Sequence, residues 1–190
     1  SCSDSSDPIV PDPEPTPTPT PTPEPEPGPS LTSQGWPINY GGVMLQGFSW
    51  DSYNDSQWKI LANQADDMKG YIDLVWLPQS GKCAETVQVM GYKPYYYFNQ
   101  NSSFGTETEL RNLITKFKAN GIGAIADVVI NHRNTEGWFT FPAETYKGVT
   151  YQMLSTDICK NDDQGKTATQ AATEGVNLSN NNDEGTDFDD

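Results

Sequence analysis

Asn131 and His132 follow a nearly continuous apolar run, residues 122–130, which a single charge, Asp127, interrupts. A run so rich in β-branched residues is typical of a parallel strand that is buried on both faces. Because a buried carboxylate needs a cation or several hydrogen-bond donors, we expect Asp127 to meet such partners deep in the fold. Asn131 and His132 would then lie beyond the carboxyl end of the strand, where ligands of parallel α/β folds bind.

His132 is the only histidine of the chain. An imidazole in this place can act as a general base, as a metal ligand or as a structural hydrogen-bonding group. The residue type alone leaves these three roles open.

Two further strands and two helices precede this strand. Residues 43–48 and 73–77 are predicted to be strands, and Pro78 stops the second. Between them, Ser56 can cap a helix that ends at Gly70. Its apolar residues fall on one face at steps of three and four, which indicates a buried side: Trp58, Leu61, Ala62, Ala65 and Met68.

A second helix is predicted after the long, aromatic and Asn-rich segment 79–105. Thr106 and Glu109 form a potential capping box, and Gly121 closes the helix. Its apolar stripe consists of Leu110, Leu113, Ile114 and Phe117. Three strands alternating with two helices predict a parallel sheet, either doubly wound or part of a TIM barrel. No glycine-rich phosphate loop follows residues 43–48, which argues against a nucleotide-binding fold.

Three segments resemble motifs of the α-amylase family of glycoside hydrolases. Asp-Val-Val-Ile-Asn-His at residues 127–132 is similar to the third-strand motif, and Leu-Gln-Gly-Phe-Ser-Trp at 45–50 to the first strand and its exit. Gly-Tyr-Lys-Pro at 91–94 is similar to the loop after the second strand. The resemblance runs from about residue 42 to 190 and is closest to plant-type α-amylases and their bacterial relatives.

This resemblance implies the N-terminal portion of a TIM (β/α)8 barrel in an α/β fold. Residues 36–132 would form the first three β/α units of the catalytic barrel. Residues 133–190 would begin the irregular, calcium-binding subdomain that protrudes after the third strand.

The resemblance also implies roles in sugar binding. Tyr92 would be the aromatic platform beneath the sugar at the cleavage point, with an ordinary packing tyrosine as the alternative. His132 would hydrogen-bond a hydroxyl of the same sugar. Asp127 would lie beneath the site and pair with a buried arginine of the next strand, so it would not be the nucleophile.

Calcium is the implied cofactor. The amide oxygen of Asn131 is a hard ligand of the kind that Ca²⁺ takes, together with carboxylates and carbonyls. Asp187 best matches the plant-type pattern for a second ligand, and Asp162 and Asp163 are weaker candidates. The alternative is that this acidic, Asn-rich tract is a solvated loop.

The family performs retaining hydrolysis of α-1,4-glucosidic bonds in starch- and glycogen-type glucans, which needs two carboxylates about 5–5.5 Å apart. The resemblance places the nucleophile Asp, the acid/base Glu and a third Asp beyond Asp190. Residues 1–190 alone are therefore expected to be inactive and to fold poorly. The alternatives are a non-catalytic α-glucan-binding surface lipoprotein and a smaller α/β domain with an unrelated role.

The N-terminal 35 residues differ from the rest. Residues 8–29 hold eleven of the fifteen prolines, which predicts a disordered, extended tether. Cys2 with this tether resembles the lipidated start of a mature bacterial lipoprotein, which implies a secreted, membrane-anchored protein at the cell surface; a free thiol is the alternative. Cys83 and Cys159 are expected to be separate thiols. At a net charge of −15 the sequence has no basic patch for nucleic acid.

Overall fold

The computed structural model describes residues 11–21, 39–85 and 87–184, and the chain divides into two units, residues 1–40 and 41–190. In the first unit, residues 11–21 are exposed and form neither helix nor strand. Cys2 and Asp187 lie outside the described residues, so the lipid anchor and this calcium ligand stay predictions. In the part that is described, no helix is long and apolar enough to cross a bilayer.

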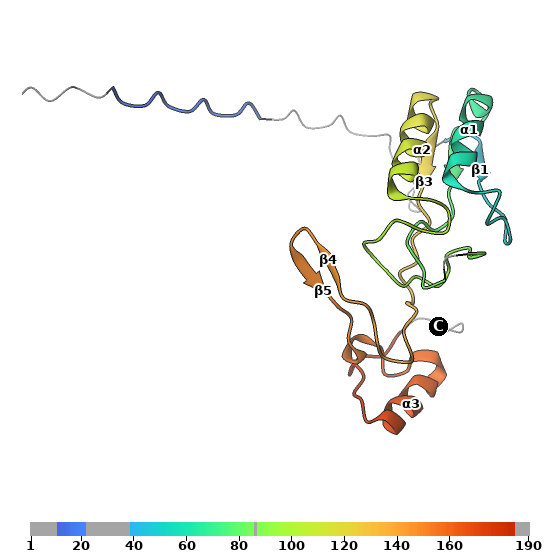
Figure 1. The fold of residues 1–190 in the computed structure, drawn as a ribbon, viewed down its shortest axis with the longest axis vertical. Coiled ribbons are helices and arrows are strands. Elements are labelled where there is room, and N and C mark those ends of the chain that lie inside the picture. Colours follow the sequence, from blue (N-terminus) through green and yellow to red (C-terminus); the bar gives the residue numbers. More distant parts are fainter. Residues whose placement is uncertain (1–10, 22–38, 86, 185–190) are drawn as a thin grey trace, which may run out of the picture. The chain divides into compact units, whose positions relative to one another are not determined.

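The second unit is built on a parallel sheet with the strand order β1-β2-β3; Figure 1 labels its two outer strands, β1 and β3. The strands are β1 (Met44–Gln46), β2 (Leu74–Trp76) and β3 (Gly123–Ile125). All three run parallel, and helices connect them in the order β-α-β-α-β. The predicted parallel α/β architecture is therefore confirmed. The three strands form an open sheet and do not close into a barrel.

The third strand differs from its prediction in both length and burial. β3 ends at Ile125, and the chain continues through residues 126–130 without strand pairing. Val128 is 69% exposed and Ile130 is 82% exposed. β3 is an edge strand of this sheet, so the described residues do not cover its outer side. The prediction that residues 122–130 are buried on both faces is wrong for this structure.

The first helix, α1 (Trp58–Met68), begins later than its predicted cap. Gln57 occupies the N-cap position without a side-chain cap bond. Ser56 instead donates its hydroxyl to the backbone oxygen of Gly47 at 3.0 Å and shares a hydrogen bond with Ser52. The predicted Ser56 cap is therefore wrong, because this hydroxyl ties the helix start to the end of β1.

The second helix, α2 (Glu107–Ala119), has the predicted capping box. The Thr106 hydroxyl accepts a hydrogen bond from the Glu109 backbone N–H at 3.2 Å, and the Glu109 carboxylate accepts from the Thr106 backbone N–H at 3.4 Å. This reciprocal pair satisfies two amide donors that the first turn would otherwise leave unpaired. Gly121 follows in a left-handed conformation with φ of 72°, as expected of a helix-closing glycine.

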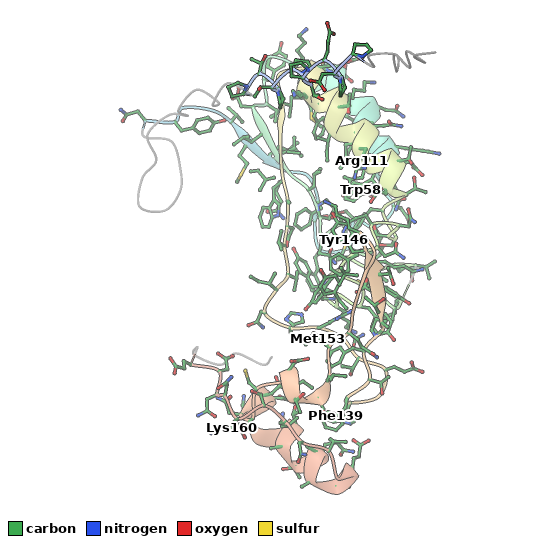
Figure 2. The ribbon with its side chains drawn as sticks, turned by 90° about the vertical axis from the view of Figure 1, so that its left-hand side faces the viewer. Trp58, Arg111, Phe139, Tyr146, Met153 and Lys160 are labelled. Carbon is green, nitrogen blue, oxygen red and sulfur yellow. The ribbon has the colours of Figure 1, made fainter. Side chains whose placement is uncertain are left out.

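The two helices and the sheet enclose one apolar core, with Trp58 at the start of α1 (Figure 2). Ile114 is 43% exposed, so the predicted stripe of α2 is narrower than expected. The buried members of the core are Trp58, Leu61, Ala65, Val75, Leu77, Met90, Phe104, Leu110, Leu113, Phe117 and Ile122.

The remaining residues contain short elements. A hairpin pairs β4 (Glu144–Tyr146) with β5 (Val149–Tyr151) in antiparallel register. Two 3-10 turns, η1 (Ser155–Asp157) and η2 (Asp162–Gly165), precede the helix α3 (Lys166–Glu174). The sequence predicts only an irregular subdomain in this stretch, so the hairpin and α3 are additions to that prediction.

Candidate functional site

Tyr92 and His132 come from different loops, after β2 and after β3, and the structure brings them together. The Nε2 atom of His132 lies 2.7 Å from the backbone oxygen of Tyr92. A carbonyl oxygen can only accept, so Nε2 carries the hydrogen and donates it. The other ring nitrogen, Nδ1, lies 3.3 Å from the side-chain amide nitrogen of Asn131. That amide nitrogen is a donor, so Nδ1 is the acceptor in this contact.

Asp127 lies next to Tyr92. Its Oδ2 atom accepts hydrogen bonds from the Tyr92 hydroxyl at 2.9 Å and from Trp76 Nε1 at 3.1 Å. Asp127 thus meets two donors, as a partly desolvated carboxylate requires, although it is half-buried and not deep in the fold. Burial, followed by this hydrogen bond and the negative charge of Asp127, raises the pKa of Tyr92 to about 12. The phenol therefore stays protonated and remains a donor at neutral pH.

The turn before Tyr92 depends on Gly91 and Gln79. Gly91 has φ of 99°, and a Cβ atom at this position would meet the Gln79 backbone oxygen at 3.0 Å. The buried side chain of Gln79 donates to the Gly91 backbone oxygen at 2.7 Å. Both the left-handed backbone and the close approach favour glycine. The direction in which the chain enters Tyr92 is therefore fixed by the side chain of Gln79, three residues after the end of β2.

Trp50 is a site residue that the sequence reasoning did not single out. Its ring is nearly parallel to that of Tyr92, with an interplanar angle of 10° and centroids 6.3 Å apart. Trp50 is 78% exposed, and with Tyr92 it lines a cavity of about 300 Å³. Trp50 ends the 45–50 motif, just after the first strand, and this position could have indicated that it belongs to the site. The exposed indole therefore adds a second aromatic ring, stacked with Tyr92, to the lining of this cavity.

Asn131 faces a second cavity, of about 250 Å³, which His132 also lines. Four carboxylates line the same cavity: Asp157, Asp162, Asp163 and Asp183. Amide and carboxylate oxygens are the ligand types that Ca²⁺ prefers, so the donor set has the right chemistry.

The spacing of these acids does not match that of a metal site. Among the described residues, no three Asp, Glu, His or Cys side chains lie close enough together to hold a metal ion. Asp162 accepts a hydrogen bond from the Thr167 hydroxyl at 2.5 Å, and Asp163 pairs with Lys166 at 3.6 Å. The residue types around Asn131 fit calcium, whereas their arrangement in this structure is not that of a formed site.

Arg133 and Glu144 form a nearly buried ion pair beside the site, with Arg133 Nη2 3.0 Å from Glu144 Oε2. Their side chains are 4% and 9% exposed. The sequence reasoning missed this pair because the two residues are eleven positions apart in a stretch without periodicity.

The two remaining cysteines, Cys83 and Cys159, are free thiols, as predicted. Cys83 is buried, and this burial raises the pKa of its thiol.

A family model described as the catalytic domain of alpha amylase matches residues 71–173. Alpha-amylase 3, chloroplastic, from Arabidopsis thaliana is 36% identical over 93 residues, which are 48% of this chain and 10% of that protein. An alpha-amylase from Aeromonas hydrophila is 32% identical over 115 residues, 58% of this chain and 25% of the relative. The chain thus spans a quarter or less of the length of these relatives.

Among solved structures, wild type alpha-amylase I from Eisenia fetida is similar at 20% identity with a TM-score of 0.43. The similar region covers 58% of this chain and 21% of that one.

Proposed function

Because this chain belongs to the α-amylase family of glycoside hydrolases, we propose that the protein hydrolyses α-1,4-glucosidic bonds in starch- or glycogen-type glucans. Tyr92 and His132 bind the sugar at the point of cleavage in this proposal. The match at residues 71–173 includes both residues, and it also includes Asp127 and Asn131.

The observation that carries the proposal is the hydrogen bond between His132 and the Tyr92 backbone, at 2.7 Å. It places an aromatic ring and a polar ring edge next to each other at one exposed site. A glucose ring has the complementary surface, with apolar C–H faces and hydroxyl groups at its edge. The sugar would stack on Tyr92 and Trp50. One of its hydroxyl groups would accept a hydrogen bond from His132 Nε2–H, together with the Tyr92 backbone oxygen or in its place.

Asp127 holds Tyr92 in this arrangement and is not the nucleophile. Its Oδ2 atom already accepts from Tyr92 and Trp76, at 2.9 and 3.1 Å. Retaining hydrolysis needs a nucleophile and an acid/base about 5–5.5 Å apart. As the family resemblance implies, the proposal places both carboxylates outside residues 1–190.

The proposal includes one structural calcium ion, bound by Asn131 and by acids from the cavity that Asn131 lines or by Asp187. Bound calcium would draw these carboxylates together and so order the segment after β3. It also includes a lipid on Cys2 that holds the secreted protein at a membrane, with residues 1–35 as a spacer. Mass spectrometry of the native N-terminal peptide tests the anchor, because unmodified Cys2 would contradict it.

The activity is tested with the full-length protein on soluble starch and maltooligosaccharides. We expect hydrolysis with retention of the anomeric configuration, which NMR of the released sugars measures. His132→Ala should lower kcat by about 10- to 1000-fold, which is about 1.4–4 kcal/mol of transition-state stabilisation, and should change KM less. A raised KM with unchanged kcat would show ordinary substrate binding by His132. Glucan binding without hydrolysis by the wild type would show a non-catalytic glucan-binding protein instead.

A further inference from the structure

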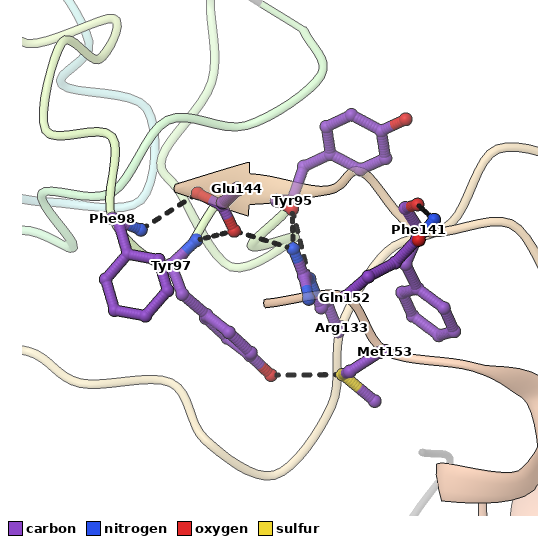
Figure 3. Close-up of polar contacts among 8 residues, drawn as sticks. All are labelled: Tyr95, Tyr97, Phe98, Arg133, Phe141, Glu144, Gln152 and Met153. Carbon is purple, nitrogen blue, oxygen red and sulfur yellow. Dashed lines mark hydrogen bonds and ion pairs between the residues drawn. The ribbon is translucent and has the colours of Figure 1, made fainter. Parts of the chain in front are cut away.

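Arg133 directly follows His132, and its charged group is held by backbone and aromatic contacts. Nε and Nη2 donate to the backbone oxygen of Tyr95 at 3.0 and 2.7 Å (Figure 3). The guanidinium carbon lies 4.2 Å from the ring centroid of Tyr97 and 5.5 Å from that of Phe141. A planar guanidinium suits this site because it donates in a fixed fork while its faces contact aromatic rings.

Glu144, at the start of β4, completes the same cluster through both of its oxygens. Oε2 accepts from Arg133 at 3.0 Å and from the Tyr97 backbone N–H at 2.9 Å. Oε1 accepts from the Phe98 backbone N–H at 3.0 Å (Figure 3). Since both oxygens face donors, the site requires a carboxylate, and an amide of the same shape would turn an N–H₂ group toward an N–H group.

These contacts continue a row of bonds between two segments, residues 92–98 and residues 132–134. His132 donates to the Tyr92 backbone oxygen at 2.7 Å, and the Asn134 backbone N–H donates to that of Pro94 at 2.8 Å. The side chain of Arg133, which lies between His132 and Asn134 in the sequence, donates to the backbone oxygen of Tyr95. Tyr92 and His132 therefore stand at one end of a short array, and the buried ion pair closes its other end.

We propose that Arg133 and Glu144 are a positioning pair that sets the placement of Tyr92 relative to His132 for glucan binding and cleavage. The inference rests on the proposed function, because the pair contacts no sugar and acts only through those two residues. Removing one partner would leave a buried charge without its counterion, which a protein relieves by moving the chain segments apart. Displacement of about 1 Å at a reacting group can lower a rate about 100-fold.

The test compares one substitution in two surroundings of the full-length protein. Glu144→Gln removes the charge and one acceptor at nearly constant size. Glu107→Gln is the matched control, because Glu107 pairs with Arg111 at 3.5 Å on the surface of α2, where these side chains are 49% and 74% exposed. We expect kcat/KM on maltooligosaccharides to fall by about 10- to 100-fold for Glu144→Gln and to change less than about twofold for Glu107→Gln.

A second comparison separates positioning from a general loss of structure. If Glu144 acts through His132, the loss from Glu144→Gln should shrink below about threefold when His132 is already alanine. An undiminished loss in that background would overturn the proposal. Amide hydrogen exchange gives a readout without substrate: Tyr97 and Phe98 should exchange faster in Glu144→Gln, while α2 keeps its protection. Unchanged exchange at both amides would contradict the assigned contacts.

If Glu144→Gln does not fold, Arg133→Lys is the variant that tests the positioning role. It keeps the buried charge pair but loses the guanidinium fork, so we expect a folded protein with a smaller loss in kcat/KM. Full activity in Arg133→Lys would overturn the positioning role. Wild-type protein without action on glucans would contradict the proposed function itself, whereas an active wild type with an equally active Glu144→Gln variant would contradict only this inference.

Discussion

Residues 41–125 and residues 131–184 are held by different kinds of contact. The first region has a continuous apolar core, in which Trp58, Leu113 and Phe117 are 0% exposed. The second has few buried apolar side chains, such as Phe141 and Ala171, each 4% exposed. It is tied to the first region by directed hydrogen bonds, in which Arg133 donates to the Tyr95 backbone oxygen and Glu144 accepts from the Tyr97 backbone N–H (Figure 3).

The candidate site lies where these two regions meet. Tyr92 comes from a loop of the first region, and its neighbour Met90 belongs to the apolar core. His132 lies near the start of the second region, and a hydrogen bond at 2.7 Å joins it to the Tyr92 backbone oxygen. The comparison suggests a division of roles: burial provides stability on one side, and polar geometry sets the placement of site residues on the other.

The largest effect is expected from Phe117→Ala, which breaks the apolar region. Truncating a fully buried phenylalanine removes its transfer free energy and leaves a cavity, so we expect a loss of about 3–5 kcal/mol in the free energy of unfolding. Ile114→Ala, on the same helix but at a residue 43% exposed, is the control and should cost much less. Denaturant unfolding of the full-length protein measures both. Equal losses would mean that the described core does not carry the stability of this region.

Calcium removal is the corresponding way to break the polar region. A ligand at 100 times its Kd stabilises the folded state by about 2.7 kcal/mol, so chelation should lower the Tm of metal-loaded protein. Asn131→Ala should reproduce part of this loss, whereas Asn131→Asp keeps an oxygen ligand. Hydrogen exchange should rise in residues 131–184 and not in α1 or α2. An unchanged Tm after chelation, in protein confirmed to hold the metal beforehand, would contradict the calcium proposal.

The smallest expected effect on stability comes from the Tyr92–Asp127 hydrogen bond, and it depends on pH. The pKa of Tyr92 is raised from 10.0 to about 12, so its contribution to stability is complete below pH 10 and disappears as the pH rises to 12. Tyr92→Phe lacks this hydroxyl, and its deficit against the wild type should be about 0.5–1.5 kcal/mol at pH 8. Unfolding of both proteins between pH 8 and pH 12 should show the deficit shrinking. A deficit that does not change with pH would contradict the Tyr92–Asp127 bond.

Local sequence rules were sufficient for most of the first region. The three- and four-residue spacing of Trp58, Leu61 and Ala65 gave the buried side of α1, and Thr106 with Glu109 gave the start of α2. These features depend on residues that are neighbours along the chain. The expectation that Tyr92 and His132 share one site came from the motif resemblance.

The features that sequence reasoning missed depend on contacts between distant residues. Ser56 is a good cap by type, but its hydroxyl bonds to Gly47 instead. Residues 126–130 are apolar by sequence apart from Asp127, but whether they are buried depends on other parts of the chain packing over them, which periodicity does not predict. The pairing of Glu144 with Arg133 has no signature because each is an ordinary charged residue in an aperiodic stretch.

In the proposed function, Tyr92 and His132 act on the same sugar. A double-mutant cycle tests this: kcat/KM on maltooligosaccharides is measured for the full-length wild type, Tyr92→Ala, His132→Ala and the double variant. Tyr71→Ala is the aromatic control, since Tyr71 is 77% exposed and lies beyond the end of α1. We predict a coupling energy of at least about 0.5 kcal/mol between Tyr92 and His132, and no effect of Tyr71→Ala. Losses that add within about 0.3 kcal/mol would show two independent surfaces and contradict the claim.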